Sequence, residues 1–340
     1  MTFEASRHVK ARIMRKVYHS LVVARARIRP ARLACAERIE KMRIIGRAVV
    51  IFIVFGLPVI ARGQQLDGYA LATALGRQGM QVGEVYRFEF PRTDLKISIH
   101  GISVSPLLAG DSWVAFGGTV SDAQSIGELA LLPGEVAPVL ASLRAGGFKI
   151  TSLGSYFPLE KPQLTSLTFM GIGPVLKLAK GLHAALAASG TPLGPVPSPS
   201  AAPLSTPRWA AFIEKILGRN GTMDGGVMTV TVARIDSVTQ GMMGIPPAMG
   251  VGETLRFENI GGGQVVAAGS LALTSNEMTG VLASLEAHHF TVASVGSRLT
   301  DENPRLYFLR FFASGPAKKI VKGLKAALGG IQIEPPGMER

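Results

Sequence analysis

Apolar side chains recur at helical spacing in three segments of the second half of the chain, and each segment predicts an amphipathic helix. The apolar positions are Trp209, Phe212, Ile213, Ile216 and Leu217; Met278, Val281, Leu282 and Leu285; and Ile320, Val321, Leu324 and Leu328. The second stripe follows Thr274 and Glu277, which have the spacing of a capping box. The third follows Pro316, a residue that suits a helix start, and its lysines lie on the opposite face.

Runs that favour extended structure lie between these helices. They cover residues 227–235, 264–273, 290–297 and 305–313. Gly261, Gly262 and Gly263 stand before the second run and predict a hairpin turn. This order of strands and helices predicts an α+β domain with helices packed on one face of a mainly antiparallel sheet.

The first half of the chain repeats this pattern at a constant offset of 142 residues. Residues 139–155 match 281–297 at 10 of 17 positions, and residues 167–186 match 309–328 at 11 of 20. The shorter segment 75–79 corresponds to 217–221 at the same offset. A register held over the whole repeat indicates a tandem duplication.

The expected organisation is two tandem homologous α+β domains, at residues 64–188 and 208–329. Residues 189–207 contain six prolines and predict an extended linker. Residues 330–340 are expected to form a C-terminal tail. Whether the two copies pack together, and the oligomeric state, stay open at this point.

The net charge of +13 is concentrated at the N-terminus. Residues 1–41 hold 11 basic and 3 acidic side chains, residues 42–63 add three arginines, and the remaining 277 residues carry 36 − 14 = 22 basic against 23 − 3 = 20 acidic side chains. A domain region so close to neutrality lacks the basic footprint of a nucleic-acid-binding protein. No nucleic-acid partner is therefore expected.

Residues 42–63 have the layout of a secretory signal peptide. Arg43 and Arg47 precede an uncharged, mostly apolar stretch, and small residues at 61 and 63 place the cleavage site between Gly63 and Gln64. We expect export to the periplasm or the medium, with an uncleaved membrane anchor as the alternative. Residues 1–41 form a basic extension that is either upstream of a true start at Met42 or an arm for an anionic membrane surface.

Motifs for catalysis, metals and cofactors do not stand out. The only cysteine is Cys35, so the chain after the leader has no thiol. The histidines after the leader are His100, His183, His288 and His289, which form no HExxH pattern, and no GxSxG motif is present. Gly171–Pro174 is only half of a dinucleotide fingerprint, and a helix entry explains it. We therefore predict no catalytic residue, no metal site and no cofactor.

Several stretches resemble the LppY/LpqO family, exported bacterial proteins built on a domain of unknown function. The likeness covers roughly residues 66–329 and rests on 91–96, 97–101, 110–116, 245–251 and 303–308. The resemblance implies a Leu-His-Asn-His-like segment after the capped helix, but both copies lack both histidines. The matching residues are Leu153, Gly154, Ser155 and Tyr156 in the first copy and Val295, Gly296, Ser297 and Arg298 in the second. Metal or proton chemistry based on those imidazoles is therefore not expected.

These observations predict an exported, non-catalytic protein of the cell envelope that binds a small molecule or an envelope component. The candidate ligand-binding residues are Ser155, Tyr156, Ser297 and Arg298, because the family concentrates polar residues there and these side chains offer hydroxyl, stacking and anion-pairing chemistry. The alternative is an envelope hydrolase or metal-dependent enzyme with a degenerate site, using Ser155, Ser297 or scattered carboxylates. Membrane association through an uncleaved leader is the third possibility.

Overall fold

The computed structural model describes residues 64–194 and 206–337. The predicted signal peptide with its cleavage site before Gln64, the basic extension and the middle of the proline-rich segment lie outside these ranges or at their edge. None of the helices within the described ranges is long and apolar enough to cross a bilayer.

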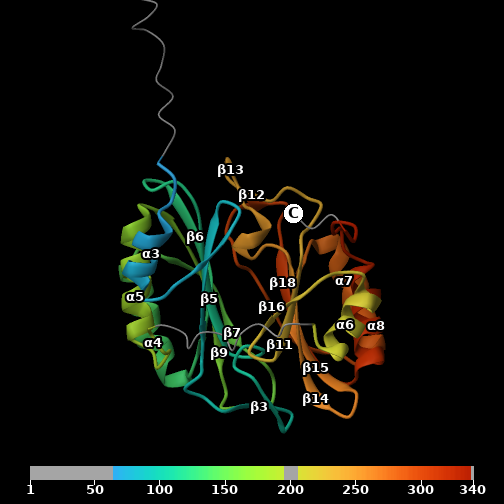
Figure 1. Cartoon of the computed structure of the whole chain (residues 1–340). Coiled ribbons are helices and arrows are strands. Elements are labelled where there is room, and N and C mark those ends of the chain that lie inside the picture. Colours follow the sequence, from blue (N-terminus) through green and yellow to red (C-terminus); the bar gives the residue numbers. More distant parts are fainter. Residues whose placement is uncertain (1–63, 195–205, 338–340) are drawn as a thin grey trace, which may run out of the picture. The chain divides into compact units, whose positions relative to one another are not determined.

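The first repeat is an antiparallel sheet with helices along one face (Figure 1). Its helices are α3 (Gly68–Leu75), α4 (Val136–Ala145) and α5 (Val175–Ala187), with the 3-10 turn η1 (Pro133–Glu135) before α4. Its strands are β1 (Met80–Val82), β2 (Val85–Pro91), β3 (Ile97–Ile99), β4 (Ile102–Val104), β5 (Asp111–Gly118), β6 (Ala123–Leu131), β7 (Lys149–Ser155), β8 (Glu160–Lys161) and β9 (Thr165–Gly173). The main sheet has the order β1-β2-β5-β6-β9-β7, and β4-β3-β8 form a small second sheet.

The second repeat has the same architecture. Its helices are α6 (Arg208–Leu217), α7 (Ser275–Ala287) and α8 (Ala317–Leu328), with the 3-10 turn η2 (Pro247–Met249). Its strands are β10 (Thr222–Asp224), β11 (Val227–Val232), β12 (Thr239–Gln240), β13 (Met243–Gly244), β14 (Glu253–Gly261), β15 (Gln264–Leu273), β16 (Thr291–Gly296), β17 (Glu302–Asn303) and β18 (Tyr307–Pro316). The sheet orders are β10-β11-β14-β15-β18-β16 and β13-β12-β17. The predicted fold class, two tandem homologous α+β domains, is confirmed.

Local sequence signals place several of the element ends. The capping box before α7 is present, and the backbone N–H of Thr274 donates to Oε2 of Glu277 at 2.7 Å. Helices α3 and α6 both end at a glycine in the left-handed region, Gly76 with φ 72° and Gly218 with φ 75°. A side chain there would strain the backbone, which explains the shared Leu-Gly-Arg pattern at these two positions.

Each sheet packs its outer face on its own helices. In the second repeat, α8 buries Ile320, Val321, Leu324 and Leu328, as its apolar stripe predicts. The stripe predicted for α6 is partly wrong, because Phe212 is 39% exposed whereas Ala210 is buried. Helix α6 is rotated so that Ala210, Ile213 and Leu217 face the sheet.

The inner faces of the two sheets pack on each other within one compact unit, residues Gly63–Arg340. Two apolar clusters each contain side chains from both repeats: Trp113 and Met170 contact the cluster around Met249 and Phe308, and Tyr156 and Phe157 belong to the cluster of Phe312. Strands such as β6 are therefore covered on both faces, and every residue of β6 is buried. The repeats, separate in the sequence, share one interior.

A buried arginine anchors the capped helix turn in each repeat. Arg92 donates to the carbonyl oxygen of Ala130 at 2.9 Å and pairs with Asp94 and Glu135 at 2.8 and 2.7 Å. At the positions 142 residues later, Arg234 donates to the carbonyl oxygen of Ala272 at 2.6 Å and pairs with Asp236 and Glu277 at 2.6 and 3.0 Å. The same network in both copies shows that the duplication preserved a structural ion-pair cluster.

The chain beyond the last helix of each repeat returns along its own domain. The N–H of Gly190 donates to Glu135 at 2.7 Å, and Arg77 donates to the carbonyl oxygen of Pro192 at 2.8 Å. In the second repeat, the N–H of Gln332 donates to Glu277 at 2.8 Å. The beginnings of the predicted linker and tail are therefore packed segments.

Candidate functional site

A cavity of about 80 Å³ lies where the two sheets meet at their β7 and β16 edges. Strands β7 and β9 supply one side, and β15, β16 and β18 supply the other. The lining residues are Glu128, Ser152, Leu153, Gly154, Ser155, Ser166, Thr168, Ser270, Ser294, Val295, Gly296, Ser297, Arg298, Phe308 and Arg310. The wall is thus rich in hydroxyl groups and comes from both repeats.

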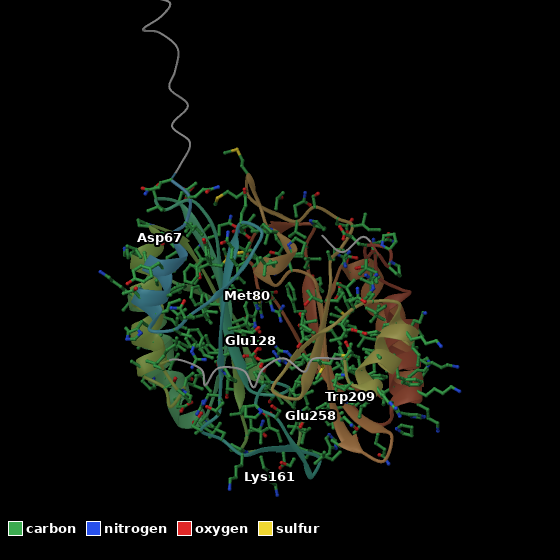
Figure 2. The ribbon with its side chains drawn as sticks, in the orientation of Figure 1. Asp67, Met80, Glu128, Lys161, Trp209 and Glu258 are labelled. Carbon is green, nitrogen blue, oxygen red and sulfur yellow. The ribbon has the colours of Figure 1, made fainter. Side chains whose placement is uncertain are left out.

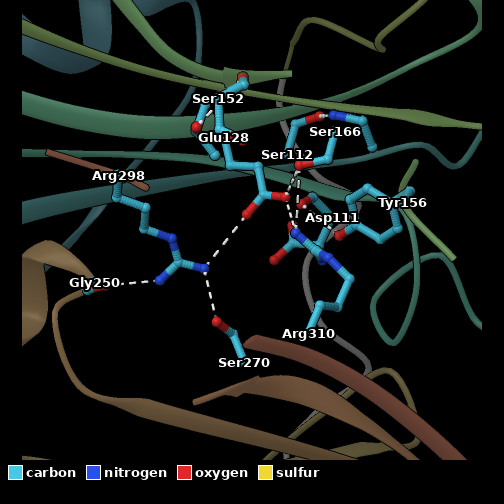
Figure 3. Close-up of polar contacts among 12 residues, drawn as sticks. Asp111, Ser112, Glu128, Ser152, Tyr156, Ser166, Gly250, Ser270, Arg298 and Arg310 are labelled. Atoms are coloured by element: carbon cyan, nitrogen blue, oxygen red, sulfur yellow. Dashed lines mark hydrogen bonds and ion pairs between the residues drawn. The ribbon is translucent and has the colours of Figure 1, made fainter. Parts of the chain in front are cut away.

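Glu128 of β6 is the central charged residue of this cavity (Figures 2 and 3). One carboxylate oxygen pairs with the guanidinium of Arg310 and accepts a hydrogen bond of 2.6 Å from the hydroxyl of Ser166. The other lies 3.5 Å from Nη2 of Arg298. Burial alone would raise the pKa of Glu128, but the charges of Arg310 and Arg298 outweigh burial and hold the pKa below its ordinary value. Glu128 is therefore a stable anion and a poor proton acceptor.

Arg298 follows the end of β16 and points inward (Figure 3). Its Nη1 donates to the carbonyl oxygen of Gly250 at 2.7 Å, and its Nη2 contacts the hydroxyl of Ser270 at 3.2 Å. The guanidinium carbon lies 4.4 Å from the ring centre of Phe308 and 5.3 Å from that of Trp113. Burial lowers the pKa of Arg298 to about 10, against the raising effect of Glu128. Arg298 is still fully charged at neutral pH.

Arg310 of β18 holds the first repeat from the other side. Its guanidinium carbon lies 4.0 Å from the ring centre of Tyr156, a cation–π contact. The hydroxyl of Tyr156 donates to the carbonyl oxygen of Asp111 at 3.4 Å. The tyrosine ring is therefore a platform for Arg310.

A second, smaller cavity of about 30 Å³ adjoins the first and shares Glu128, Ser270, Arg298 and Arg310 with it. Here Asp111 pairs with Arg256 of the second repeat, and Arg87 stacks 4.2 Å from the ring centre of Trp113. Burial and then the neighbouring Glu89 raise the pKa of Asp111 to about 7, against the charge of Arg256.

The structure gathers all four predicted ligand-binding residues around these cavities. Ser155, Ser297 and Arg298 line the larger one, and Tyr156 and Arg298 line the smaller one. Ser155 is exposed at the rim, whereas Tyr156 is 2% and Arg298 5% exposed. Tyr156 therefore offers no open stacking face, because Arg310 already occupies its ring.

Sequence reasoning missed Glu128, Arg310, Ser166, Asp111 and Arg256. A signal existed, since Glu128 and Arg310 each interrupt an apolar strand where the other copy has Ser270 and Thr168. A charged residue in a strand buried on both faces needs a partner, and the partner here comes from the other repeat.

The histidines have local structural contacts. Nδ1 of His183 lies 3.2 Å from the carbonyl oxygen of Leu75, and Nδ1 of His288 lies 2.7 Å from that of Ser284. No group of three or more His, Cys, Asp and Glu residues suited to a metal occurs within residues 64–194 and 206–337.

Comparison with known proteins identifies the family. A duplicated α+β unit whose copies share one interior defines the class of this protein. The family model described as Domain of Unknown Function (DUF1259) matches residues 69–188 and again residues 211–329, and the chain belongs to this family. Each match covers one repeat, so the tandem duplication is confirmed.

Other comparisons add little. No curated protein matches the chain. The crystal structure of EtuB from Clostridium kluyveri is 11% identical with a TM-score of 0.18, covering 74% of this chain and 90% of that chain. The structure of crystal form I of TP0453 is 12% identical with a TM-score of 0.17, covering 77% and 98%. Similarity at this level carries no argument about fold or function.

Proposed function

We propose that this protein is an exported, non-catalytic binding protein of the cell envelope, and that a small ligand occupies the cavity between its repeats. The observation that carries the proposal is the composition of the cavity wall. Hydroxyl groups from β7, β9, β15 and β16 surround two guanidinium groups and one carboxylate, and neither repeat alone supplies this set. Convergent polar groups in a concave site formed by two units are typical of ligand-binding proteins.

We further propose that the chain is LppY/LpqO-like, with the histidine pair of that family replaced. Side chains alternate between the two faces of a strand, so the replaced positions 154 and 156 share one face, as do 296 and 298. Tyr156 and Arg298 point into the interior, and Gly154 and Gly296 line the larger cavity. The replacements therefore fall on the cavity wall, where they alter the chemistry of a shared site.

Export rests on the leader pattern of residues 42–63 and on the absence of cysteine after Cys35. Mass spectrometry of the mature protein tests it directly. A chain that starts at Gln64 supports export with cleavage, and a chain that retains residues 42–63 overturns the cleaved form.

Binding fits the site better than catalysis does. A general base needs a pKa near the working pH, whereas the pKa of Glu128 is held below its ordinary value and an arginine does not release its proton. The second candidate function is hydrolysis by Ser166, whose hydroxyl lies 2.6 Å from the Glu128 carboxylate. Release of p-nitrophenol from p-nitrophenyl acetate that Ser166→Ala abolishes would favour this second function.

A matched pair of glycine variants tests the cavity. A Cβ at Gly154, which lines the cavity, or at Gly280, on the exposed outer side of α7, would meet no atom within 4 Å. Gly154→Trp should fill the cavity, and Gly280→Trp should leave it open. Thermal-shift measurements with inorganic phosphate, acetate, D-glucose and Zn²⁺ should show a stabilising probe for the native protein and for Gly280→Trp, with the effect lost in Gly154→Trp. An equal shift in all three proteins would place the ligand elsewhere and refute the proposal.

A further inference from the structure

The two adjoining cavities contain more positive than negative side chains. Arg87, Arg256, Arg298 and Arg310 line them against only two carboxylates, Asp111 and Glu128. Glu89 pairs with Arg87 at 3.2 Å and adds a third carboxylate beside the smaller cavity. One guanidinium therefore remains in excess even when all three carboxylates are ionised. An uncompensated buried charge is unfavourable, so the site favours an additional anion.

Hydrogen-bond donors are also in excess. Nε of Arg298 and Nε of Arg310 are buried without a hydrogen-bond partner, and the side chain of Arg298 is only 7% exposed. The oxygens of Glu128 already accept from Ser166, Arg310 and Arg298. The unpartnered donors belong to groups that pair well with oxyanions, whose oxygens accept charge-assisted hydrogen bonds.

The size of the larger cavity limits the ligand. About 80 Å³ holds several waters or one small polyatomic ion, because a single water needs about 10–15 Å³ by the same measure. Sites for drug-sized ligands have volumes of about 300–1,000 Å³. A nucleotide or an oligosaccharide is therefore too large to enter.

We infer that the cavity between the repeats binds a small oxyanion, such as phosphate or a short carboxylate, through Arg298, Arg310 and the surrounding hydroxyl groups. This inference rests on the proposed function and names its ligand class. Ser155 at the rim and Ser166 within the wall supply hydroxyl donors, and Glu128 keeps the two guanidinium groups apart and oriented. The shared chemistry is a compact group with two or more oxygens and at least one negative charge.

Isothermal titration with inorganic phosphate, sulfate and acetate, at ionic strength held constant with chloride, tests the inference. At least one of these anions should bind to the native protein. Arg298→Gln should weaken its affinity at least tenfold, because it removes a buried charge and the planar donor pair. Arg144→Gln, on the exposed side of α4, should bind like the native protein.

A variant pair at the rim keeps the test sharp even if Arg298→Gln does not fold. Ser155 is exposed, so both replacements are compatible with the fold. Ser155→Asp places a negative charge at the cavity and should weaken anion binding, whereas Ser155→Asn, similar in size and neutral, should retain most of it. Equal anion affinity in the two variants would overturn the inference.

Failure of the inference and failure of the proposed function are distinguishable. If no anion binds but D-glucose stabilises the protein and Gly154→Trp abolishes that effect, the ligand is neutral and the binding function stands. If an anion binds equally to the native protein and to Gly154→Trp, the cavity is not the site, and both proposals fall.

Discussion

The guanidinium of Arg310, from the second repeat, lies against the carboxylate of Glu128, from the first. The equivalent positions in the opposite repeats are Thr168 and Ser270, so the pair exists only in one direction across the interface. The duplication therefore supplied two equal folds, and later divergence placed one charge of each sign on their facing surfaces. This ion pair forms the centre of the proposed binding site.

Glu128→Gln should destabilise the protein by about 3 kcal/mol, because it leaves two buried guanidinium groups without their carboxylate. Urea denaturation measures the change in the free energy of unfolding. The double variant Glu128→Gln with Arg310→Thr, which copies the pair found in the opposite direction more closely, should recover part of the loss. A double variant as unstable as the sum of the two single variants would contradict this coupling.

The stability of the protein should fall as the pH rises from about 4 to about 8. Burial raises the pKa of Glu253 to about 8, and its Oε1 has no hydrogen-bond partner. Because the unfolded carboxyl titrates near 4.3, the folded state holds an extra proton between these values, and that stabilisation is lost as the pH rises through the folded pKa. One such proton changes the free energy of unfolding by at most about 1.4 kcal/mol per pH unit.

Glu253→Gln should make this decline shallower, as seen by urea denaturation at several pH values. Asp111 and Glu160, whose pKa values burial raises to about 7, should leave a residual slope. Glu286→Gln, on the exposed side of α7, serves as the control and should keep the native profile. An unchanged slope in Glu253→Gln would show that this carboxyl is not protonated in the folded protein.

Arg92→Met and Arg234→Met should each lower the free energy of unfolding by about 3 kcal/mol, because each leaves buried or half-buried carboxylates without their cation. The two losses should be similar, since both networks have the same geometry. Arg144→Met at an exposed position should change stability by less than about 0.5 kcal/mol. Guanidinium chloride titrations of the three variants provide the comparison.

Gly181→Ala should destabilise the first repeat by about 1–3 kcal/mol. A Cβ at Gly181 would lie 2.8 Å from the Cα of Gly146, where α4 and α5 touch through their backbones. Gly280→Ala on α7 meets open space and should stabilise by up to about 1 kcal/mol through helix propensity. Thermal denaturation should therefore move in opposite directions for the same substitution, and equal shifts would contradict the close helix contact.

Much of the fold could be predicted because it depends on local periodicity. The capping box at Thr274 and Glu277, the apolar face of α8 and the glycine turn at Gly261–Gly263 each act within a few residues. The α6 stripe was predicted less well. Phe212 and Ala210 lie on adjacent sides of the helix, and only packing against the sheet decides which one is buried.

The candidate site could be predicted only in part. Positions 155, 156, 297 and 298 were identified from their place after a strand in each copy, and they do border the cavities. Their roles differ from expectation at Tyr156, because the residue that covers it, Arg310, is 154 positions away in the sequence. Glu128 and Asp111 have no sequence neighbour that announces their ion pairs.

The sequence by itself determined the duplication, the α+β class and the helices and strands of each copy, because a repeated register and side-chain periodicity are properties of the chain alone. The tertiary structure decided that the two sheets face each other, that β7 and β16 meet, and that charges from both repeats converge on one cavity. The physical reason is that a buried charge needs a partner in space. Which residue becomes that partner depends on how the two copies pack, and no local pattern encodes that choice.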